Sequence, residues 1–528
     1  MSSATTGGTV TLSRDTNQAL GIGRFALDFM AGRVGAGPDG SVLERTELFH
    51  TDAVICGLSA LALRTNAPTV LRAEALEYPV ARADSGACVF GSAVRVQPEK
   101  AVVANNAAVR EWDSNGTNFG YWPDLGHTAG EFGHNDFYGV VVAACQQRGL
   151  GGESALRGMV LLDEIRGRLS SVFSLKTYKI DHVVHGAIAS AAVYGALMGA
   201  TAEQIESAIG MVVAHSIPWR AIRAGKQLSD SKGASAAISS EAAVLAMRRS
   251  MRGFIGPRDI FRNPESMFRQ FVKTGGESPF DLVLAHSGSD FAVMGMHFKL
   301  GLYEHQSAGA LQGLINLLSA NPGLLAGGGA GIGKITIKAY EPAFGIIGDP
   351  AKRDPRTRQS ADHSMVYIVG TLLRKAVEAA ARGEFRPDAS ASRDGVWKQL
   401  MLDPYDYAPG AIDHRVTRAF MEKIAFEHGG AEYDRRYPDG IPTSVVITDT
   451  KGTAHDSGLV MYPAGHSRNT TADLRGILDR KFRLLGGLAV ESGRVDALLG
   501  RLHGLGRKTP GQVSDLYNIE IVERAGYE

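Results

Sequence analysis

Helices rich in small residues, chiefly alanine, glycine and serine, are the feature that most constrains this fold. His185–Met198 and Ser235–Ser250 have this composition, and Ala202–Ala214 between them is a further predicted helix with Thr201 as its N-cap. Small side chains let helix axes approach closely, but each one buries little apolar area. Such helices are stable only when they are packed together, so the sequence predicts a tightly packed helical core over about Leu43–Gly253.

The pattern changes after about Ser289. Lys334–Tyr340 and part of Ser444–Thr450 alternate between apolar and polar residues, which predicts strands with one buried face. A hairpin turn at Thr448–Thr453 is expected to lead into a second strand at Ser457–Tyr462. Further helices are predicted at Gln306–Leu318, Ser364–Arg382, Leu474–Leu485 and Val495–Leu505.

These elements predict a mainly α fold, in which a large all-helical domain contains an inserted, smaller α+β domain. The first part of the helical domain is expected at residues 1–290 and the α+β domain at residues 291–466. Residues 467–528 are expected to form a helical tail that completes the first domain.

Charge and composition exclude several classes of protein. The 56 basic and 55 acidic residues give a net charge of +1, which provides no overall field for nucleic acid or an anionic membrane. Three scattered cysteines form no disulfide framework and no C-x-x-C motif, which favours a reducing compartment. The amino terminus shows no signal peptide, and the weakly polar run Gly186–Ala200 is shorter than the roughly 20 residues of a membrane-spanning helix. A soluble, cytoplasmic protein is expected.

Familiar motifs do not account for this chain. Gly328–Lys334 resembles the start of a phosphate-binding loop, but Ile335 stands where Ser or Thr belongs and the glycines precede a strand. His127 and His134, with Asp136 nearby, match no standard zinc spacing, so no metal site is expected. The G-x-S-x-G motif of serine hydrolases does not occur.

Four polar segments are candidates for chemistry, each with a structural alternative. The first, Asp113–Thr117 followed by Gly133–Asp136, holds carboxylates, a hydroxyl and an imidazole among turns, as active-site loops do; surface turns and caps have a similar composition. In the second, Asp181-His182 and then His185 stand at the start of a small-residue helix, where the helix dipole lowers an imidazole pKa and attracts anions. Two histidines at this spacing are also often structural.

The third segment holds four cations, Arg220, Arg223, Lys226 and Lys232. Arginine pairs with carboxylates bidentately, so this group suits a polycarboxylate, although a solvated basic loop has the same composition. In the fourth segment, Tyr367 follows Asp362-His363 and is expected on the same helix face as His363. None of the four segments identifies a function on its own.

Taken in order, these segments resemble the MmgE/PrpD family, and more closely its 2-methylcitrate dehydratase branch. The resemblance covers about Ser85–Leu505, and the loop between Thr117 and His134 is longer here, so His127 competes with His134 for the histidine role. The motifs that carry it are Asp113-x-x-x-Thr117, Gly133-His134 with Asp136, Asp181-His182, Arg220-x-x-Arg223 with Lys232, Phe298-Lys299 with Gln306-Ser-Ala, Asp362-His363-x-x-x-Tyr367 and Tyr462-Pro-Ala-Gly465-His466.

The resemblance implies a large helical domain and a smaller α+β domain, a homodimer, and a site between the domains. It implies a hydro-lyase that dehydrates a small tricarboxylate, of the 2-methylcitrate to 2-methylaconitate type, without a cofactor or metal. The expected catalytic residues are Asp113, His134, His182, Lys232 and Tyr367, and the expected substrate-binding residues are Thr117, Arg220, Arg223 and His363.

The chemistry requires a base beside a carboxylate, cations that stabilise enolate-like charge, and an acid for the departing hydroxide. We expect His182 and either Asp113 or His134 to divide the proton transfers, with Tyr367 on the departing hydroxyl. Decarboxylation of the cis-aconitate type and epimerisation of a polycarboxylate pass through a similar carbanion and stay open. Two other classes also stay open: a metal-dependent hydrolase using His127, His134 and Asp136, and a non-catalytic binding protein.

Overall fold

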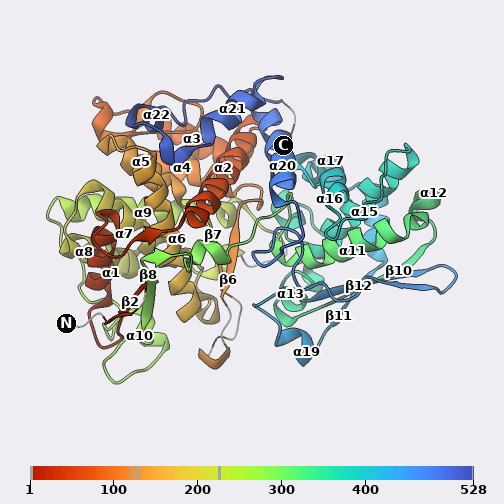
Figure 1. The fold of residues 1–528 in the computed structure, drawn as a ribbon, viewed down its shortest axis with the longest axis horizontal. Helices are drawn as coiled ribbons and strands as arrows, with labels where there is room; N and C mark the ends of the chain where they lie inside the picture. Colours follow the sequence, from red (N-terminus) through yellow and green to blue (C-terminus); the bar gives the residue numbers. More distant parts are fainter. Residues whose placement is uncertain are drawn as a thin grey trace.

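The computed structural model describes residues 4–6, 8–120, 123–125, 127, 131–223, 227–525 and 527. The chain forms two lobes that lie side by side, a larger, mainly helical lobe and a smaller lobe built on a four-stranded sheet (Figure 1). Helix α20 (Leu474–Ala489) packs against α2 (Gly40–Ala62) of the larger lobe and α16 (Asp394–Leu400) of the smaller lobe. The mainly α fold with a smaller α+β part is confirmed, while the domain boundaries near residues 290 and 466 stay a prediction.

Small-residue helices form the centre of the larger lobe. Its helices besides α2 are α1 (Gln18–Met30), α3 (Asn66–Leu76), α4 (Pro98–Arg110), α5 (Tyr138–Arg148), α6 (Gly152–Val172), α7 (Val183–Met198), α8 (Ala202–His215), α9 (Asp230–Met251) and α10 (Met267–Phe271). Helix α7 packs against α5, α6, α8 and α9, and a Cβ atom at Gly195 would lie 2.7 Å from side-chain atoms of Ile205 in α8 and Met247 in α9. The expected close packing of these helices is confirmed.

The helices were compared with the length and hydrophobicity that a membrane-spanning helix needs. Within the described part of the chain, no single helix is both long and apolar enough to cross a membrane. The bent pair α2–α3, which turns by 91° at its break, meets that test only when its two helices are taken together.

Capping residues set the helix starts in the larger lobe. Thr201 caps α8 as expected, because its side chain accepts a hydrogen bond from the Gln204 amide and the Gln204 side chain accepts one from the Thr201 amide. Helix α9 begins at Asp230 rather than at the expected Ser235. Lys232 therefore lies in the first turn of this helix and not in the loop before it.

A cap also corrects the expected geometry of the fourth motif. Helix α15 (Met365–Ala381) begins after Ser364, whose side-chain oxygen accepts a hydrogen bond from the Tyr367 amide. His363 thus precedes the helix, so it does not share a helix face with Tyr367 as expected. Ser364 is a preferred N-cap residue, and its competition with helix propagation explains the later start.

Short strands in the larger lobe correct the expectation that it is all-helical. β6 (Thr117–Gly120) and β7 (Glu131–His134) pair antiparallel and bring Thr117 opposite His134. Strands of at most four residues are too short to show an alternating pattern, so periodicity did not indicate them. The other strands of this lobe are β1 (Ala4–Thr6), β2 (Thr9–Leu12) and β8 (Leu282–Ala285) in one sheet, and the pairs β3 (Gly37–Pro38) with β9 (Ser287–Gly288) and β4 (Ala87–Cys88) with β5 (Arg95–Val96).

The sheet of the smaller lobe has the strand order β11–β10–β12–β13. Its strands are β10 (Ile332–Ala339), β11 (Ile424–His428), β12 (Thr443–Asp449) and β13 (Ala454–Asp456). β10 pairs in parallel with β11 and antiparallel with β12, which confirms the two alternating strands predicted from the sequence. The second arm of the hairpin is Ala454–Asp456 and not the expected Ser457–Tyr462, because beyond it only Val460 forms a bridge to Thr443.

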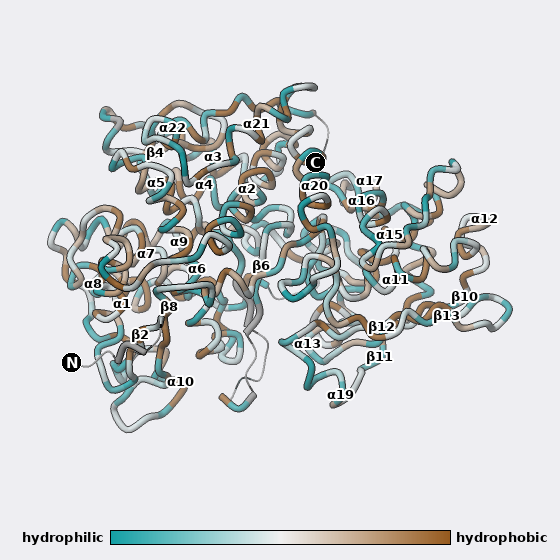
Figure 2. The backbone as a smooth tube through the Cα atoms, in the orientation of Figure 1, coloured by the Kyte–Doolittle hydropathy of each residue, from teal (hydrophilic) through white to brown (hydrophobic). Residues whose placement is uncertain are grey.

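Helices cover this sheet and connect its strands. α11 (Ala308–Ala320) packs against β12, and α11 and α15 lie on one side of the sheet (Figure 1). Hydrophobic residues follow β10 and β12 beneath them (Figure 2). The remaining helices are α12 (Ala326–Gly329), α13 (Glu341–Ile346), α14 (Arg358–Ala361), α17 (Pro409–Ile412), α18 (Arg415–Glu422) and α19 (Ala431–Asp434), followed by α21 (Val495–Leu502) and α22 (Pro510–Ser514) near the carboxyl end.

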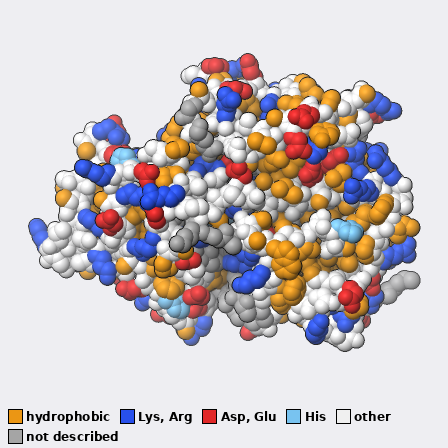
Figure 3. Space-filling model, turned by 180° about the vertical axis from the view of Figure 1, so that it is seen from behind, with side chains coloured by type: hydrophobic (Ala, Val, Ile, Leu, Met, Phe, Trp, Pro, Cys, Tyr) orange, Lys and Arg blue, Asp and Glu red, His pale blue; other side chains and the backbone are white. Residues whose placement is uncertain are grey.

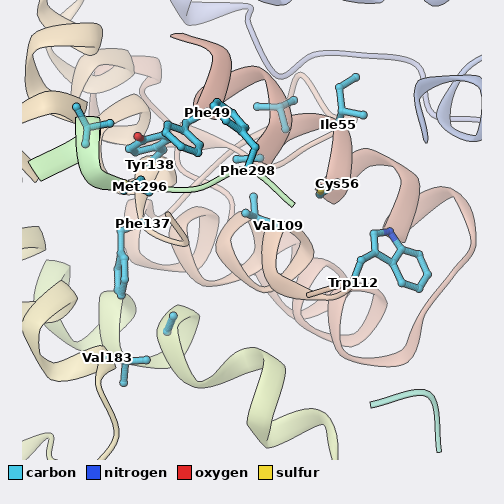
Figure 4. Close-up of a cluster of buried hydrophobic side chains, with 14 of the residues drawn as sticks. Phe49, Ile55, Cys56, Val109, Trp112, Phe137, Tyr138, Val183, Met296 and Phe298 are labelled. Carbon is cyan, nitrogen blue, oxygen red and sulfur yellow. The ribbon is translucent and has the colours of Figure 1, made fainter. Parts of the chain in front are cut away.

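A cluster of buried apolar side chains anchors the polar motifs (Figure 4). The rings of Phe49 and Phe298 stack with centroids 3.9 Å apart. Phe298 precedes Lys299, and the buried Trp112 likewise precedes Asp113. Each of these polar residues is therefore attached to a neighbour that is fixed in the core.

The segment from His297 to Lys299 lies between two of the sequence motifs. The His297 amide donates to the Thr117 carbonyl at 2.7 Å, and the Phe298 amide donates to the Gly465 carbonyl at 2.9 Å. Gly465 has a φ of +89°, and a Cβ atom there would lie 2.3 Å from the Phe298 carbonyl oxygen. Glycine is thus required at this position both for its backbone conformation and for the close approach of the neighbouring chain.

Replacing Gly465 by alanine is predicted to destabilise the protein more than the same change at Gly452. Gly452 has a φ of +88°, but a Cβ atom there has no neighbour within 4 Å. We expect Gly452→Ala to lower the free energy of unfolding by about 1–2 kcal/mol through backbone conformation alone. Gly465→Ala should cost roughly 1–3 kcal/mol more, because the backbone at Phe298 must shift. Urea denaturation of both variants measures the difference, and equal losses would contradict this account.

Candidate active site

A polar cavity lies between the two lobes. It brings together seven of the nine residues expected in the site, namely Asp113, His134, His182, Arg220, Arg223, Lys232 and His363. Five further polar residues line it, Arg110, Lys176, Glu304, Gln306 and Lys352. Segments that are far apart in the sequence therefore meet at one place.

Asp113 is the buried centre of this cavity. Its Oδ1 contacts both the Arg110 guanidinium and the Lys299 ammonium. Its Oδ2 lies 2.9 Å from Nε2 of His363 and 3.8 Å from Nζ of Lys232. Burial alone would raise the pKa of Asp113, but Arg110 and Lys299 outweigh burial and hold that pKa well below its ordinary value. Asp113 therefore stays an ionised carboxylate.

His363 connects Asp113 to a second carboxylate. Its Nδ1 lies 2.5 Å from Oδ1 of Asp362, and Nζ of Lys232 lies 3.1 Å from the same nitrogen and 3.4 Å from Asp362 Oδ1. Burial lowers the pKa of Lys232 to about 8, although Asp362 and Asp113 oppose this shift. Lys232 thus changes its charge just above neutral pH.

His134 and His182 face each other with ring centroids 5.3 Å apart. Arg110 donates to Nε2 of His134 at 3.2 Å, so the proton of this ring is on Nδ1. Burial is the main cause that lowers the pKa of both histidines well below its ordinary value. Both rings are therefore neutral at pH 7. Among the described residues, neither ring nitrogen of His182 has a hydrogen-bond partner, which leaves this imidazole available to a ligand.

The second and third motifs form one structural unit. The Arg220 amide donates to the Lys179 carbonyl at 2.8 Å, which docks the 3-10 helix Arg220–Arg223 beside the start of α7. The Asp181 carboxylate accepts from Arg223, with Nη2 at 3.2 Å, and Nη1 of Arg220 lies 4.0 Å away. Arg223 is thus held by Asp181. Lys226, which the sequence grouped with these cations, lies outside the described residues.

Comparison with known proteins identifies the family. The MmgE/PrpD N-terminal domain matches residues 29–278, and the MmgE/PrpD C-terminal domain matches residues 304–499. The chain belongs to the MmgE/PrpD family. The N-terminal match begins well before Ser85, where the motif-based resemblance started.

Three relatives illustrate the likeness. The chain is 24% identical over 437 residues to the 2-methylcitrate dehydratase of Escherichia coli (strain K12), covering 78% of this chain and 82% of that protein. It is 25% identical over 502 residues to the mitochondrial 2-methylcitrate dehydratase of Yarrowia lipolytica, covering 92% and 86%. It is 25% identical over 330 residues to the alkylcitrate dehydratase phiI of a fungal species, covering 61% and 59%.

Two of the expected site residues do not line the cavity. Thr117 lies in β6 and its backbone pairs with His297, so it supports the segment that leads to Lys299. The Tyr367 hydroxyl donates to the Asp406 carbonyl at 2.6 Å, which directs this side chain into the smaller lobe of the MmgE/PrpD fold. The structure therefore separates Tyr367 from the other expected catalytic residues.

His127 and His134 occupy different cavities. His127 lines a second cavity with Phe173, Tyr178 and Phe280, and burial lowers its pKa to about 4. The structure therefore does not bring together His127, His134 and Asp136, the residues of the alternative metal-dependent hydrolase. Among the described residues, Asp113, Asp362 and His363 do place ligand-type atoms within 4.8 Å of one another, but Lys232, Lys299 and Arg110 supply positive charge there.

Sequence reasoning missed several polar residues of the site. The sequence contained a signal for Arg110, because this residue precedes Asp113 by three positions at the end of a helix and can pair with it. It also contained one for Lys299, which belongs to the Phe298-Lys299 motif. Glu304 and Lys352 had no local pattern. Burial raises the pKa of Glu304, and Nζ of Lys352 has no hydrogen-bond or ion-pair partner among the described residues.

The charge of the cavity favours an anionic ligand. Among the described residues that line it, six are basic and two are acidic. Asp113 pairs with Arg110 and Asp181 pairs with Arg223, while Lys352 forms no ion pair among the described residues, and Glu304 and Asp349 act on it only at longer range. Buried cations are stable only when they are paired, so the cavity is suited to a ligand that carries more than one carboxylate.

The neutral state of His182 predicts how stability depends on pH. Its folded pKa lies below the unfolded value of about 6.5, so its contribution is present above pH 6.5 and is lost as the pH falls below that value. His182→Gln should remove about 1.4 kcal/mol per pH unit from the decline in unfolding free energy between pH 6 and 5. Urea denaturation across this range measures the slope. The control His503→Gln changes an exposed histidine, and an equal effect of both variants would contradict the assignment.

Proposed function

We propose that this protein is a cofactor-free hydro-lyase that dehydrates a small tricarboxylate, of the 2-methylcitrate to 2-methylaconitate type. The observation that carries the proposal is the cavity in which six basic side chains and Glu304 surround the ionised Asp113. Membership of the MmgE/PrpD family and relatives named 2-methylcitrate dehydratase support it.

In this proposal the substrate carboxylates bind to cations from both lobes. Arg220 comes from the larger lobe, Lys352 comes from the smaller lobe, and Lys232 lies between Asp113 and Asp362. Their positive charge stabilises the enolate-like charge that develops when the neighbouring carbon loses a proton. Such preorganised groups commonly supply several kcal/mol of transition-state stabilisation.

His182 is the proposed base. Its imidazole is neutral at pH 7 and its ring nitrogens have no hydrogen-bond partner among the described residues, so a lone pair is available to take the proton from carbon. His134 is held by Arg110 through Nε2 and presents its Nδ1 proton, which makes it a donor rather than a base. Asp113 positions Arg110, Lys299 and His363 around the substrate.

Glu304 is the proposed acid, in the role that Tyr367 was expected to fill. Glu304 lines the cavity and burial raises its pKa, which favours the protonated carboxyl group. When the carbon–oxygen bond breaks, this proton converts the leaving hydroxide to water and Glu304 becomes a carboxylate. The proton held by His182 then returns to Glu304, so both groups end the cycle as they began.

The experiment that tests the function uses purified, chelator-treated protein. It is mixed separately with 2-methylcitrate, citrate and cis-aconitate, and both ultraviolet absorbance of unsaturated acid and released carbon dioxide are followed. We expect an absorbance rise from 2-methylcitrate without carbon dioxide, and none with the control variant His182→Gln. Carbon dioxide from cis-aconitate would instead identify a decarboxylase. No change with any of the three acids would contradict the proposal.

The titration of Lys232 is expected to set the alkaline limit of the reaction. Its pKa of about 8 means that the stabilising ammonium is lost as the pH rises through 8, so kcat/KM should decline above that value. Lys232→Arg keeps the charge and should abolish this decline, with lower activity because arginine is planar. Lys232→Gln should lose about 10²–10³-fold below pH 8 and, having no ammonium to lose, should show no decline above it. Steady-state kinetics from pH 6 to 9.5 measure this, and a decline that persists in Lys232→Arg belongs to another group.

A homodimer, which the family resemblance implies, and a cytoplasmic location, which the cysteine pattern and the amino terminus favour, are part of the proposal. Exposed hydrophobic side chains gather on the larger lobe when the molecule is seen from behind (Figure 3). A groove between α8 and α9 is lined by apolar residues that include Met211, Leu245 and Phe254. These features support contact with a second copy through the larger lobe.

A further inference from the structure

A buried lysine outside the cavity contacts the backbone of the site. Lys481 in α20 is fully buried. Its Nζ donates to Oδ1 of Asp52 in α2 at 2.6 Å, to the Ser114 carbonyl at 2.6 Å and to the Lys299 carbonyl at 2.9 Å. An ammonium group has three protons, and each of them has an acceptor here.

The two carbonyls belong to the two sides of one ion pair. Ser114 directly follows Asp113, and the Asp113 carboxylate contacts the Lys299 ammonium. The Ser114 hydroxyl adds a second link, because it donates to the Gly301 carbonyl at 2.8 Å. Lys481 therefore joins, through the backbone, the same two segments that the buried ion pair joins through side chains.

Asp113 needs this support more than most residues. Its φ of +50° is a left-handed conformation, which a residue with a side chain keeps only when its surroundings hold it there. The ion pair links segments that are 186 positions apart in the sequence, so no local structure sets their register. The Thr117–His297 bridge and the Ser114–Gly301 hydrogen bond join the two segments, and the Lys481 ammonium adds a fixed link at the carbonyls next to the ion pair itself.

We propose that Lys481 is a positioning residue of the active site, which aligns Asp113 with Lys299 by fixing the backbone on both sides of their ion pair. The inference rests on the proposed function only for its effect on turnover. The alternative is that Lys481 serves only as the partner of Asp52, as in any buried salt bridge.

Two variants that differ only at residue 481 separate these roles. Asp52→Asn keeps an acceptor for Lys481 and leaves its bonds to both carbonyls possible, so kcat should stay within about threefold of the wild type. Asp52→Asn/Lys481→Met removes both charges together, which avoids leaving one of them buried and unpaired. We expect its kcat to fall on the order of 10²-fold, with KM changed by less than about threefold, because misalignment affects the reacting geometry.

The pH profile gives a signature that a structural role would not produce. Lys299 is one of the charges that lower the pKa of Asp113, so its displacement should raise that pKa. The pKa of Asp113, followed by carboxyl carbon NMR, should then be higher in the double variant than in Asp52→Asn. Equal loss of activity in both variants, in parallel with thermal stability, would overturn the proposal.

Hydrogen–deuterium exchange tests the alignment without any substrate. Amides in residues 113–118 and 297–301 should exchange faster in Asp52→Asn/Lys481→Met than in Asp52→Asn. Lys375→Met is the matched control, because Lys375 donates to the Met401 carbonyl at 2.8 Å and to two carboxylates away from the cavity, and it should leave these amides unchanged. Unchanged exchange in the double variant would overturn the proposal. Faster exchange in a protein whose wild type turns over none of the acids would retain the alignment and reject the proposed function.

Discussion

The structure depends on one buried carboxylate and the cations that keep it ionised. A charged Asp113 inside the protein is stable only because Arg110 and Lys299 contact it and His363 lies beside it. These partners come from the end of α4, from the segment after β9 and from the residues just before α15. The Arg110 pair forms within one segment, but His363 comes from the smaller lobe, so the full set of partners around Asp113 forms only when both lobes are in place.

Several motif residues hold this arrangement in place. Gly465 leaves room for the Phe298 carbonyl, and Thr117 pairs with His297 on the other side of the same segment. Asp181 holds Arg223 in the docked 3-10 helix. These residues hold Lys299 and the cations of the cavity in place. A motif residue can therefore be needed for the site although it does not contact the ligand.

The sequence predicted those features that depend on neighbouring residues, such as helix caps and buried helices. Thr201 was identified as a cap because capping depends on a few adjacent residues, and the small-residue pattern of α7 indicated a buried helix. Tyr367 was expected on one helix face with His363, but α15 begins after Ser364, so His363 lies outside the helix, and the Tyr367 hydroxyl donates to the Asp406 carbonyl. Glu304 and Lys352 reach the cavity through the packing of the smaller lobe, and no pattern in their own segments indicates this.

The positive charge that this packing places in the cavity affects the protonation of His182. Arg223, Arg220 and Arg110 act on His182, and together with burial they keep its imidazole neutral although Asp181 opposes them. A bound polycarboxylate would bring negative charge to the same cavity and offset Arg220 and Arg223. The pKa of His182 would then rise, so the imidazole becomes a stronger base when an anionic ligand is present than when the cavity lacks one. The excess of positive charge thus has two effects, since it attracts the anion and makes the base responsive to it.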